Sequence, residues 1–445
     1  MLKDKMQNEK TSIAIGALCL LLVPGIMAKE NWDDHDRSNR YLARDIARAY
    51  LDSCEPDAIL FTNGDNDTFP LWYVQEIEGY RTDVRIINLS LLNTDWYIDQ
   101  AKRAAYDAAP VPFSFEHDQY RQGTRDVIYF QDRGFKGRWR VEDLIKWIKS
   151  DDPETKFTPP NAKTLNIFPK KQVRVSIDKE KVLAEGVVSL KDSAKIVDYI
   201  DWNLKTNALS KRDLMVIDLI ANNDWTRPIY FSVTVGNNSK AYFWLDEYFQ
   251  LEGLAYRFVP IRNKRKPQTI DFGVVNADKM YDNMMNRFSY GNMELPDVYL
   301  DETNKRVSYN LRNSFGRLAD QLVAEGKNDK ALEVLNRCEE LMPESKFAYN
   351  YFVFGVIEGY FKAGDTAKGM EMINLFADRL DEELTYYRQF KGQDKKLINL
   401  DIRTAVQYYQ QLVRMVQMNT DGGADPNNLE QADIFKRYQS ATTGI

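Results

Sequence analysis

One segment near the amino terminus constrains this chain more than any other, because residues 11–28 form 18 consecutive positions without a charged side chain. Lys3, Lys5 and Lys10 precede it. At about 1.5 Å of rise per residue, a helix of this length just crosses a hydrocarbon layer of about 30 Å. A basic tail that stays in the cytoplasm would place the chain from Lys29 onward on the other side of the membrane.

Two interpretations of the apolar segment remain open. A cleaved signal peptide needs a basic tail, an apolar stretch and small residues at the cleavage site, and Ala28 fits the last of these better than Ile26 does. An uncleaved segment would instead anchor the chain in the membrane. Under either interpretation the rest of the protein is exported. We therefore expect residues 11–28 to be an inner-membrane anchor and the bulk of the chain to lie in the periplasm.

The remainder has the composition of a water-soluble protein. Over the 445 residues, apolar side chains make up 44% and charged ones 28%, and this length favours more than one domain. The net charge is −6, and the 60 basic residues are scattered among 66 acidic ones, which disfavours nucleic acid as a partner. Only two histidines occur, so a histidine-based metal centre or a Ser-His-Asp hydrolase is disfavoured as well.

The first half of the chain shows the rhythm of an α/β domain. Apolar runs at Ala58–Thr62, Asp83–Leu89 and Pro228–Val235 predict strands, and the periodicity predicts helices over Ser38–Cys54 and from Pro70 to Glu78. Strands that alternate with helices indicate a parallel or mixed sheet with flanking helices. Further helices are expected at 140–149, 210–221 and 239–250, and further strands at 164–168, 173–177 and 254–260.

The last third predicts an all-α repeat region. The sequence matches itself at an offset of 38 residues, so that Glu325-Gly326 corresponds to Ala363-Gly364, and each half reads as helix, glycine turn, helix. This pattern resembles tetratricopeptide repeats, although their usual period is 34. We therefore expect four regions: residues 1–28 as tail and apolar helix, 29–265 as the α/β domain, 266–306 as a linker, and 307–445 as a helical array that binds a protein partner.

A polar segment with an adjoining indole follows the first predicted strand, where open α/β sheets bind ligands: Asn63, Asp65, Asn66, Asp67 and Trp72. Three interpretations remain open. Asp65 and Asp67 could hold a divalent cation, although the distal glutamate of an EF-hand is absent. The carboxylates and amides beside Trp72 could instead bind a sugar. Alternatively, the segment is a structural turn that caps the helix beginning at Pro70.

A second polar and aromatic segment, with Asp95 and Trp96, follows the second predicted strand. In a parallel sheet it would lie beside the first segment, which predicts one shared pocket formed by Asp65, Asp67, Asp95, Trp72 and Trp96. Carboxylates about 5–10 Å apart can perform glycosidase chemistry, so a glycoside hydrolase that uses the three aspartates is an alternative function.

A third cluster follows the apolar segment directly: Trp32, Asp33, His35 and Asp36. These side chains could bind a cation or a lipid headgroup, or they could form a solvated juxtamembrane linker. Signatures of nucleophilic catalysis and of nucleotide binding are missing, since the sequence has no G-x-S-x-G elbow, Walker loop or Rossmann glycine pattern. The residues themselves therefore assign no catalytic group and no cofactor.

Five segments resemble one known family: NGDNDTFPLWYVQEIEGYRTD at 63–83, VRIINLSLLNTDWY at 84–97, KENWDDHDRS at 29–38, WTRPIYFS at 225–232 and EGLAYRFVPI at 252–261. The family is catalogued as domain of unknown function 2723. It is similar to protein O-mannosyltransferases and is classed with the GT-C type membrane glycosyltransferases. The resemblance covers roughly residues 13–265, with helical repeats as the usual tail.

The resemblance implies a role in protein glycosylation. Family members carry a multi-span amino-terminal half that binds a lipid-linked sugar and supplies an acidic catalytic residue, and no position here corresponds to that residue. We therefore expect the chain to be the extracytoplasmic accessory portion of such an enzyme, engaging a glycan or an acceptor protein beside a multi-span partner subunit. A membrane-tethered scaffold that binds proteins through its repeats is the alternative from a different functional class.

Overall fold

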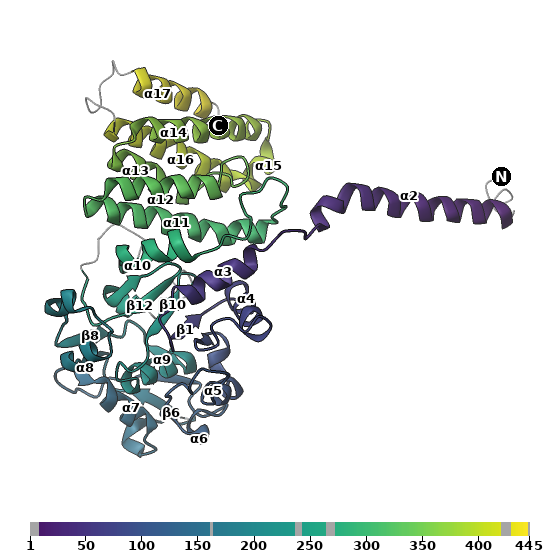
Figure 1. Cartoon of the computed structure of the whole chain (residues 1–445). Helices are drawn as coiled ribbons and strands as arrows, with labels where there is room; N and C mark the ends of the chain where they lie inside the picture. The colour runs from purple at the N-terminus through teal and green to yellow at the C-terminus, as the bar shows by residue number, and fades with distance from the viewer. Residues whose placement is uncertain (1–8, 161–162, 236–242, 264–271, 420–428, 444–445) are drawn as a thin grey trace.

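The computed structural model describes residues 9–160, 163–235, 243–263, 272–419 and 429–443, and it has three parts (Figure 1). A single long helix leaves the body at the amino terminus, an α/β domain follows, and a stack of helices completes the chain. This arrangement confirms the predicted fold class of a mixed sheet with flanking helices, followed by an all-α region.

The amino-terminal helix α2 (Glu9–His35) contains the predicted apolar segment. Residues Thr11–Trp32 form a stretch long and apolar enough to cross a membrane, and none of the most apolar part is buried against the rest of the molecule. A helix with these properties at this position is a membrane anchor or a signal sequence. It is not a core helix of the α/β domain.

The α/β domain is built on a six-stranded sheet in the order β13-β11-β12-β10-β1-β2. The middle strand β1 runs parallel to both of its neighbours, whereas β12 is antiparallel to β10. Every residue of β1, β2 and β10 is buried, which explains why these strands appear in the sequence as continuous apolar runs. The strands are β1 (Ile59–Thr62), β2 (Arg85–Asn88), β10 (Ile229–Ser232), β11 (Phe249–Leu251), β12 (Ala255–Phe258) and β13 (Val274–Val275).

Helices cover this sheet. Helix α3 (Leu42–Asp52) packs against α4 (Asp65–Glu76), which connects β1 to β2. Helix α9 (Lys211–Asn222) is almost wholly buried and begins with a capping box in which the Asp213 carboxylate accepts from the backbone N–H of Ser210 at 2.9 Å. The 3₁₀ turn η1 (Leu91–Asn93), α5 (Asp95–Ala101) and α6 (His117–Tyr120) lead away from β2.

Two smaller sheets form the part of the domain between α6 and α9. One has the order β5-β6-β3-β9 and the other the order β4-β7-β8. The strands and helices of this region are β3 (Val127–Phe130), β4 (Trp139–Arg140), α7 (Val141–Lys149), η2 (Pro153–Thr155), β5 (Lys156–Phe157), β6 (Leu165–Phe168), β7 (Gln172–Ser176), α8 (Lys179–Ala184), η3 (Leu190–Lys195), β8 (Tyr199–Asn203) and β9 (Ala208–Ser210).

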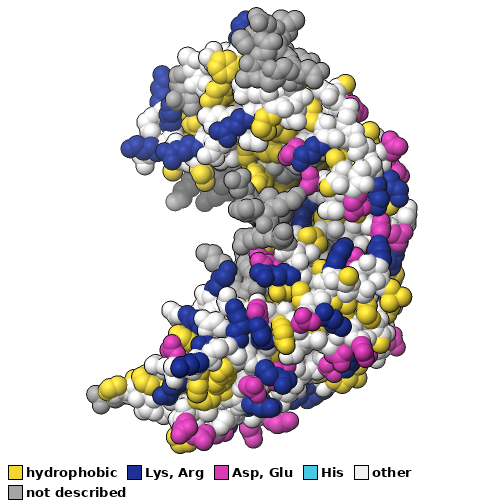
Figure 2. Space-filling view, turned by 90° about the vertical axis from the view of Figure 1, so that its left-hand side faces the viewer, with side chains coloured by type: hydrophobic (Ala, Val, Ile, Leu, Met, Phe, Trp, Pro, Cys, Tyr) yellow, Lys and Arg dark blue, Asp and Glu magenta, His cyan; other side chains and the backbone are white. Residues whose placement is uncertain are grey.

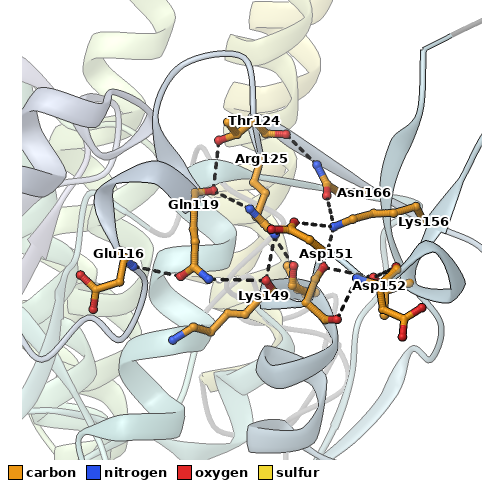
Figure 3. Close-up of polar contacts among 12 residues, drawn as sticks. Glu116, Gln119, Thr124, Arg125, Lys149, Asp151, Asp152, Lys156 and Asn166 are labelled. Carbon is orange, nitrogen blue, oxygen red and sulfur yellow. Dashed lines mark hydrogen bonds and ion pairs between the residues drawn. The ribbon is translucent and has the colours of Figure 1, made fainter.

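The side chain of Arg125 stabilises the carboxyl-terminal end of α7 through hydrogen bonds (Figure 3). It is buried, and its guanidinium donates to the carbonyls of Ile148 at 2.8 Å, Lys149 at 3.0 Å and Gln119 at 3.1 Å, and to the carboxylate of Asp151 at 2.9 Å. The carbonyls of a last helical turn have no partner within the helix. Arg125 supplies those partners, so this polar cluster is structural.

The carboxyl-terminal third is a stack of antiparallel helices, as predicted. Gly326 and Gly364, 38 residues apart, have φ angles of 73° and 100° and follow the ends of α11 and α13, in the left-handed region that glycine tolerates. The helices are α11 (Glu302–Ala324), α12 (Asn328–Leu341), η6 (Tyr351–Val353), α13 (Phe354–Ala363), α14 (Thr366–Tyr387), α15 (Gly392–Leu397), α16 (Asn399–Asn419) and α17 (Leu429–Thr442).

The array and the α/β domain enclose a hollow on one side of the molecule (Figure 2). A groove of about 310 Å³ lies at their junction, between α11, α13 and the edge strand β13. The predicted linker 266–306 contains regular structure. Its strand β13 pairs with β11, and α10 (Ala277–Tyr281) and η5 (Asp282–Arg287) come next in the chain.

Two local predictions differ from the structure. The helix expected at 239–250 is absent from its described part, since η4 (Phe243–Tyr248) is a 3₁₀ segment and β11 begins at Phe249, while residues 239–242 lie outside the described residues. Helix α4 begins at Asp65 rather than at Pro70. The predicted polar loop therefore becomes the first turn of that helix.

Candidate functional site

The carboxyl ends of β1 and β10 are tied together by one aspartate. Asp67 lies in the first turn of α4, and its carboxylate accepts from the backbone N–H of Gly64 at 3.1 Å. The same carboxylate accepts from the hydroxyl of Ser232 at 3.2 Å and from that of Thr234. Burial, and then the nearby charge of Asp67, raise the pKa of Tyr50. Asp67 therefore caps the helix and joins two segments of the domain, as the structural interpretation of this segment expects.

A cavity of about 340 Å³ opens at the edge of the sheet, beside β2. We call it the β2-edge cleft. It lies between α4, β2, α5 and the segment that follows α5, and its size is within the range of small-ligand sites. The residues that line it are Trp72, Gln75, Glu76, Thr82, Val84, Arg85, Ile86, Ile87, Trp96, Tyr97, Gln100, Ala101, Ala105, Tyr106 and Ala108.

Aromatic side chains from two helices line the cleft. Trp72 comes from α4 and is half-buried, whereas Trp96 comes from α5 and is 55% exposed. The Trp96 ring packs edge-on against Tyr97, with ring centroids 5.5 Å apart. Tyr106 is 63% exposed and donates its hydroxyl hydrogen to the carboxylate of Glu76. The cleft thus presents indole and phenol rings together with polar groups.

On the outer edge of β2, the backbone N–H and C=O groups of Ile86 face the cleft rather than β1. Arg85 and Leu89 donate their backbone N–H groups to Ala58 and Thr62 at 2.7 and 2.8 Å, so alternate residues of the strand bond to β1. Ile86 and Asn88 therefore direct their backbone groups away from β1.

On this outer edge, backbone groups of Val84 and Asn88 already have hydrogen-bond partners. The side chain of Gln75 donates to the Val84 carbonyl at 2.8 Å, and the Asn88 N–H donates to the Tyr97 hydroxyl at 2.9 Å. Ile86, which lies between them and lines the cleft, makes no such bond within the part of the chain that the structure describes. A ligand that offers both a donor and an acceptor can pair with its N–H and C=O groups.

A buried guanidinium completes the polar lining. Arg85 is 8% exposed and donates to the Gln100 carbonyl at 2.7 Å. Burial lowers the pKa of this guanidinium. Arg85 keeps its charge, because the ordinary pKa of arginine lies far above neutral pH. Neutral or anionic oxygen atoms of a ligand are favoured beside it.

The five residues of the predicted shared pocket separate into two groups. Trp72 and Trp96 both line the β2-edge cleft, whereas Asp65, Asp67 and Asp95 are not among its lining residues. Asp65 is exposed in the first turn of α4. Asp95 accepts from the backbone N–H groups of Gln122 at 3.0 Å and Trp96 at 2.8 Å. These bonds lower the pKa of Asp95, and the bond from Gln122 has the larger effect. The carboxylates of Asp67 and Asp95 are thus held by different partners, and that of Asp65 is exposed.

The other predicted residues also lie outside the cleft lining. Asn66 is exposed, and Asn63 follows β1 with a buried side-chain oxygen that has no hydrogen-bond partner in the described structure. In the juxtamembrane cluster Trp32 is 73% exposed, the His35 ring donates to the Asn31 carbonyl at 2.9 Å, and Asp36 accepts from the Ser38 N–H at 2.7 Å. The side chain of Asp33 lies outside the described part.

Sequence reasoning missed Ile86, Arg85 and Tyr106 as cleft residues. An isoleucine backbone group carries no motif, and Arg85 is part of an apolar run that indicated only a strand. The signal lies in the strand order, which only the structure gives: among the described residues, β2 is the edge strand of the six-stranded sheet. Among the described residues, no group of three or more histidine, cysteine, aspartate or glutamate side chains could hold a metal ion.

A comparison with protein-family models matches residues 43–279 to the family described as TMEM260-associated domain 2, which is more than half of the chain. The chain belongs to this family. The match runs from the start of α3 to α10, so the TMEM260-associated domain 2 contains the whole six-stranded sheet and the β2-edge cleft. It also extends past residue 265, where the sequence predicted a linker.

Membership in the TMEM260-associated domain 2 family relates this chain to membrane proteins, in agreement with the apolar helix α2. No curated protein and no solved structure matches the chain. The chemistry of the cleft therefore has to be argued from its own residues.

Proposed function

We propose that this chain is the extracytoplasmic accessory portion of a GT-C-like membrane glycosyltransferase. In this proposal α2 anchors the chain, the β2-edge cleft engages a glycan, and a multi-span membrane partner supplies the intramembrane catalytic residues. The resemblance to the domain of unknown function 2723 family supports the enzyme class. The family match and the apolar helix support the relation to a membrane.

One observation carries the proposal: Trp72 and Trp96, from two different helices, line the same open cleft. Indole rings offer apolar faces to the C–H groups of a sugar, while an N–H remains at the ring edge for a hydroxyl. Arg85, Glu76 and the open Ile86 peptide group offer donors and acceptors for the other hydroxyls. A cleft with aromatic walls and a few fixed polar groups is typical of small-molecule recognition.

Replacing Trp96 by alanine tests the proposal. The full chain, purified in detergent, should bind at least one member of a panel of immobilised mono- and disaccharides, and Trp96→Ala should weaken that binding about tenfold or more, since buried aromatic anchors contribute about 2 kcal/mol or more. Binding is measured by surface plasmon resonance with free sugar as competitor.

Tyr351→Ala is the matched control, because Tyr351 is 50% exposed and lies in the helical array, outside the cleft. It should leave sugar binding unchanged. A wild-type chain that binds no sugar of the panel, or a Trp96→Ala chain that binds as tightly as wild type, contradicts the proposal.

The groove between β13, α11 and α13 supports a second candidate function, that of a tethered scaffold. Helical arrays bind partners in such grooves, and this one lies at the junction of the two domains. A scaffold without sugar recognition would keep its protein partner in the Trp96→Ala chain and would bind none of the sugars. The two candidates therefore predict opposite results in the same binding assay.

A further inference from the structure

Helix α4 carries large apolar side chains on the side that faces solvent. Phe69, Tyr73 and Ile77 are 54%, 48% and 72% exposed. They are spaced by four residues, so they form one row along α4 and its carboxyl-terminal cap residue. We call this row the α4 stripe. The opposite side of the helix already supplies Leu71 and Val74 to the core, so the stripe is apolar surface that the described part of the fold leaves exposed.

The α4 stripe is continuous with the β2-edge cleft. The ring centroids of Phe69 in the stripe and Trp72 in the cleft are 5.6 Å apart. Single exposed apolar residues are common on protein surfaces, but a contiguous row that adjoins a cleft marks an interaction surface. The remaining question is what covers it.

The chain connectivity brings a bilayer close to the stripe. Helix α2 ends at His35 and α3 begins at Leu42, so six residues connect them, and these span at most about 20 Å. Helix α3 packs directly against α4. Figure 1 shows α2 leaving the body on the side where α3 and α4 lie, close to the start of α11. If α2 spans the membrane, α4 is among the elements nearest to the membrane surface.

The residues between α2 and the stripe have the chemistry of a membrane interface. Trp32 near the end of α2 and Tyr41 before α3 are 73% and 44% exposed, and tryptophan and tyrosine concentrate at the headgroup level of bilayers. The guanidinium of Arg44 lies 4.4 Å from the centroid of the Tyr41 ring and pairs with the Asp45 carboxylate at 2.7 Å, so the aromatic rings and not a free positive charge carry this argument.

We propose that the α4 stripe docks on the membrane surface, with Phe69, Tyr73 and Ile77 at the boundary between headgroups and acyl chains. The proposal rests on the proposed function insofar as α2 anchors the chain in the same bilayer. An interfacial helix buries its apolar side about 5–10 Å into this boundary, which is the depth that side chains of this size reach. Docking would place the mouth of the β2-edge cleft beside the lipid headgroups.

Lipid-borne quenchers test the proposal on the full chain, reconstituted in vesicles of phosphatidylcholine and phosphatidylglycerol that contain a doxyl lipid. Cys54 and Cys338 are buried and Cys19 is exposed, so a Cys19→Ser background allows one labelled site at a time. A fluorophore is attached at Tyr73→Cys or Ile77→Cys in the stripe, or at Tyr351→Cys in the helical array. We expect shallow doxyl groups to quench both stripe labels at least twofold more than the Tyr351→Cys label.

A separate arm labels the native Cys19 within α2 and reports whether this helix is in the bilayer. Quenching of the Cys19 label by deep doxyl groups tests the membrane anchor, independently of the stripe. Stripe labels that are quenched no more than the Tyr351→Cys label overturn surface docking, whatever the Cys19 label reports. In that case a protein partner, which the purified vesicles lack, would cover the stripe instead of lipid.

Discussion

Replacing Gly291 by alanine should destabilise the α/β domain by about 3 kcal/mol or more, because its backbone conformation and its close contact with α3 leave no room for a methyl group. Gly291 has a φ of 62°, where an L-residue is strained by about 1–2 kcal/mol. An added Cβ would also overlap the backbone N and Cα atoms of Leu42, the first residue of α3. The Gly291 N–H donates to the Asp45 carboxylate at 2.9 Å, so the close approach cannot relax without loss of that bond.

Gly79→Ala is the matched control for this substitution. Gly79 has a φ of 63°, nearly that of Gly291, but nothing lies within 4 Å of the position of an added Cβ. Its replacement should cost only the conformational strain of about 1 kcal/mol. Chemical denaturation of both variants, followed by tryptophan fluorescence, measures the difference. Equal midpoints for the two variants would show that the contact between Gly291 and α3 is looser than described.

The second large effect is expected at Arg125, whose replacement by methionine should cost about 3 kcal/mol. The substitution keeps most of the apolar volume but removes the four hydrogen bonds that the Arg125 guanidinium donates within the cluster of Figure 3. The carbonyl of Ile148 would lose its partner, and that of Lys149 would keep only the long bond of 3.5 Å from the Gln119 side chain. A buried polar group without a partner is costly. Thermal unfolding, followed by circular dichroism, measures the loss.

An exposed arginine in the same region provides the comparison. Arg133 donates to the Lys156 carbonyl at 2.8 Å from an exposed position, where water can replace it. Arg133→Met should therefore change the unfolding free energy by no more than about 0.5 kcal/mol. If Arg125→Met proved as mild as Arg133→Met, the Arg125 cluster would be a surface feature without a structural role.

The apolar runs predicted the central part of the fold well, because burial on both faces of a sheet leaves a continuous signal in the sequence. The three strands β1, β2 and β10 and the helix α9 lie where the sequence placed them. The strands β3 and β8 were missed, since each is only partly buried and leaves no continuous apolar run. Their positions depend on pairing with strands that are distant in the sequence.

The start of α4 shows why local rules misjudged the polar segment. Proline is typical of the first turn of a helix, which favoured Pro70 as the start. Helix α4 nevertheless begins five residues earlier, because the Asp67 carboxylate caps the Gly64 N–H and is held there by Ser232 and Thr234. Both hydroxyls come from a strand end more than 160 residues away, so no local pattern could reveal them.

The cleft could be predicted only in part, for the same reason. The two segments that follow neighbouring parallel strands were expected to share one pocket of five residues, and of these Trp72 and Trp96 line one cavity. The aspartates of the same two segments do not line it, because a helix directs successive side chains about 100° apart and only one side of α4 faces β2. The sequence was enough to predict where the two segments lie in the fold. Only the structure shows in which direction their side chains point.

Oxidation of tryptophan by N-bromosuccinimide tests the central claim most directly, because the chain contains its own reference. Trp96 in the cleft is 55% exposed and should react in the free protein, and the partly exposed Trp139 of β4, which lies outside the cleft lining and outside α2, is the reference. Peptide mass spectrometry can follow each residue with and without a saturating sugar. The account predicts that the sugar slows the oxidation of Trp96 several-fold and leaves that of Trp139 unchanged. A bound sugar that protects neither Trp96 nor Trp72 would contradict it.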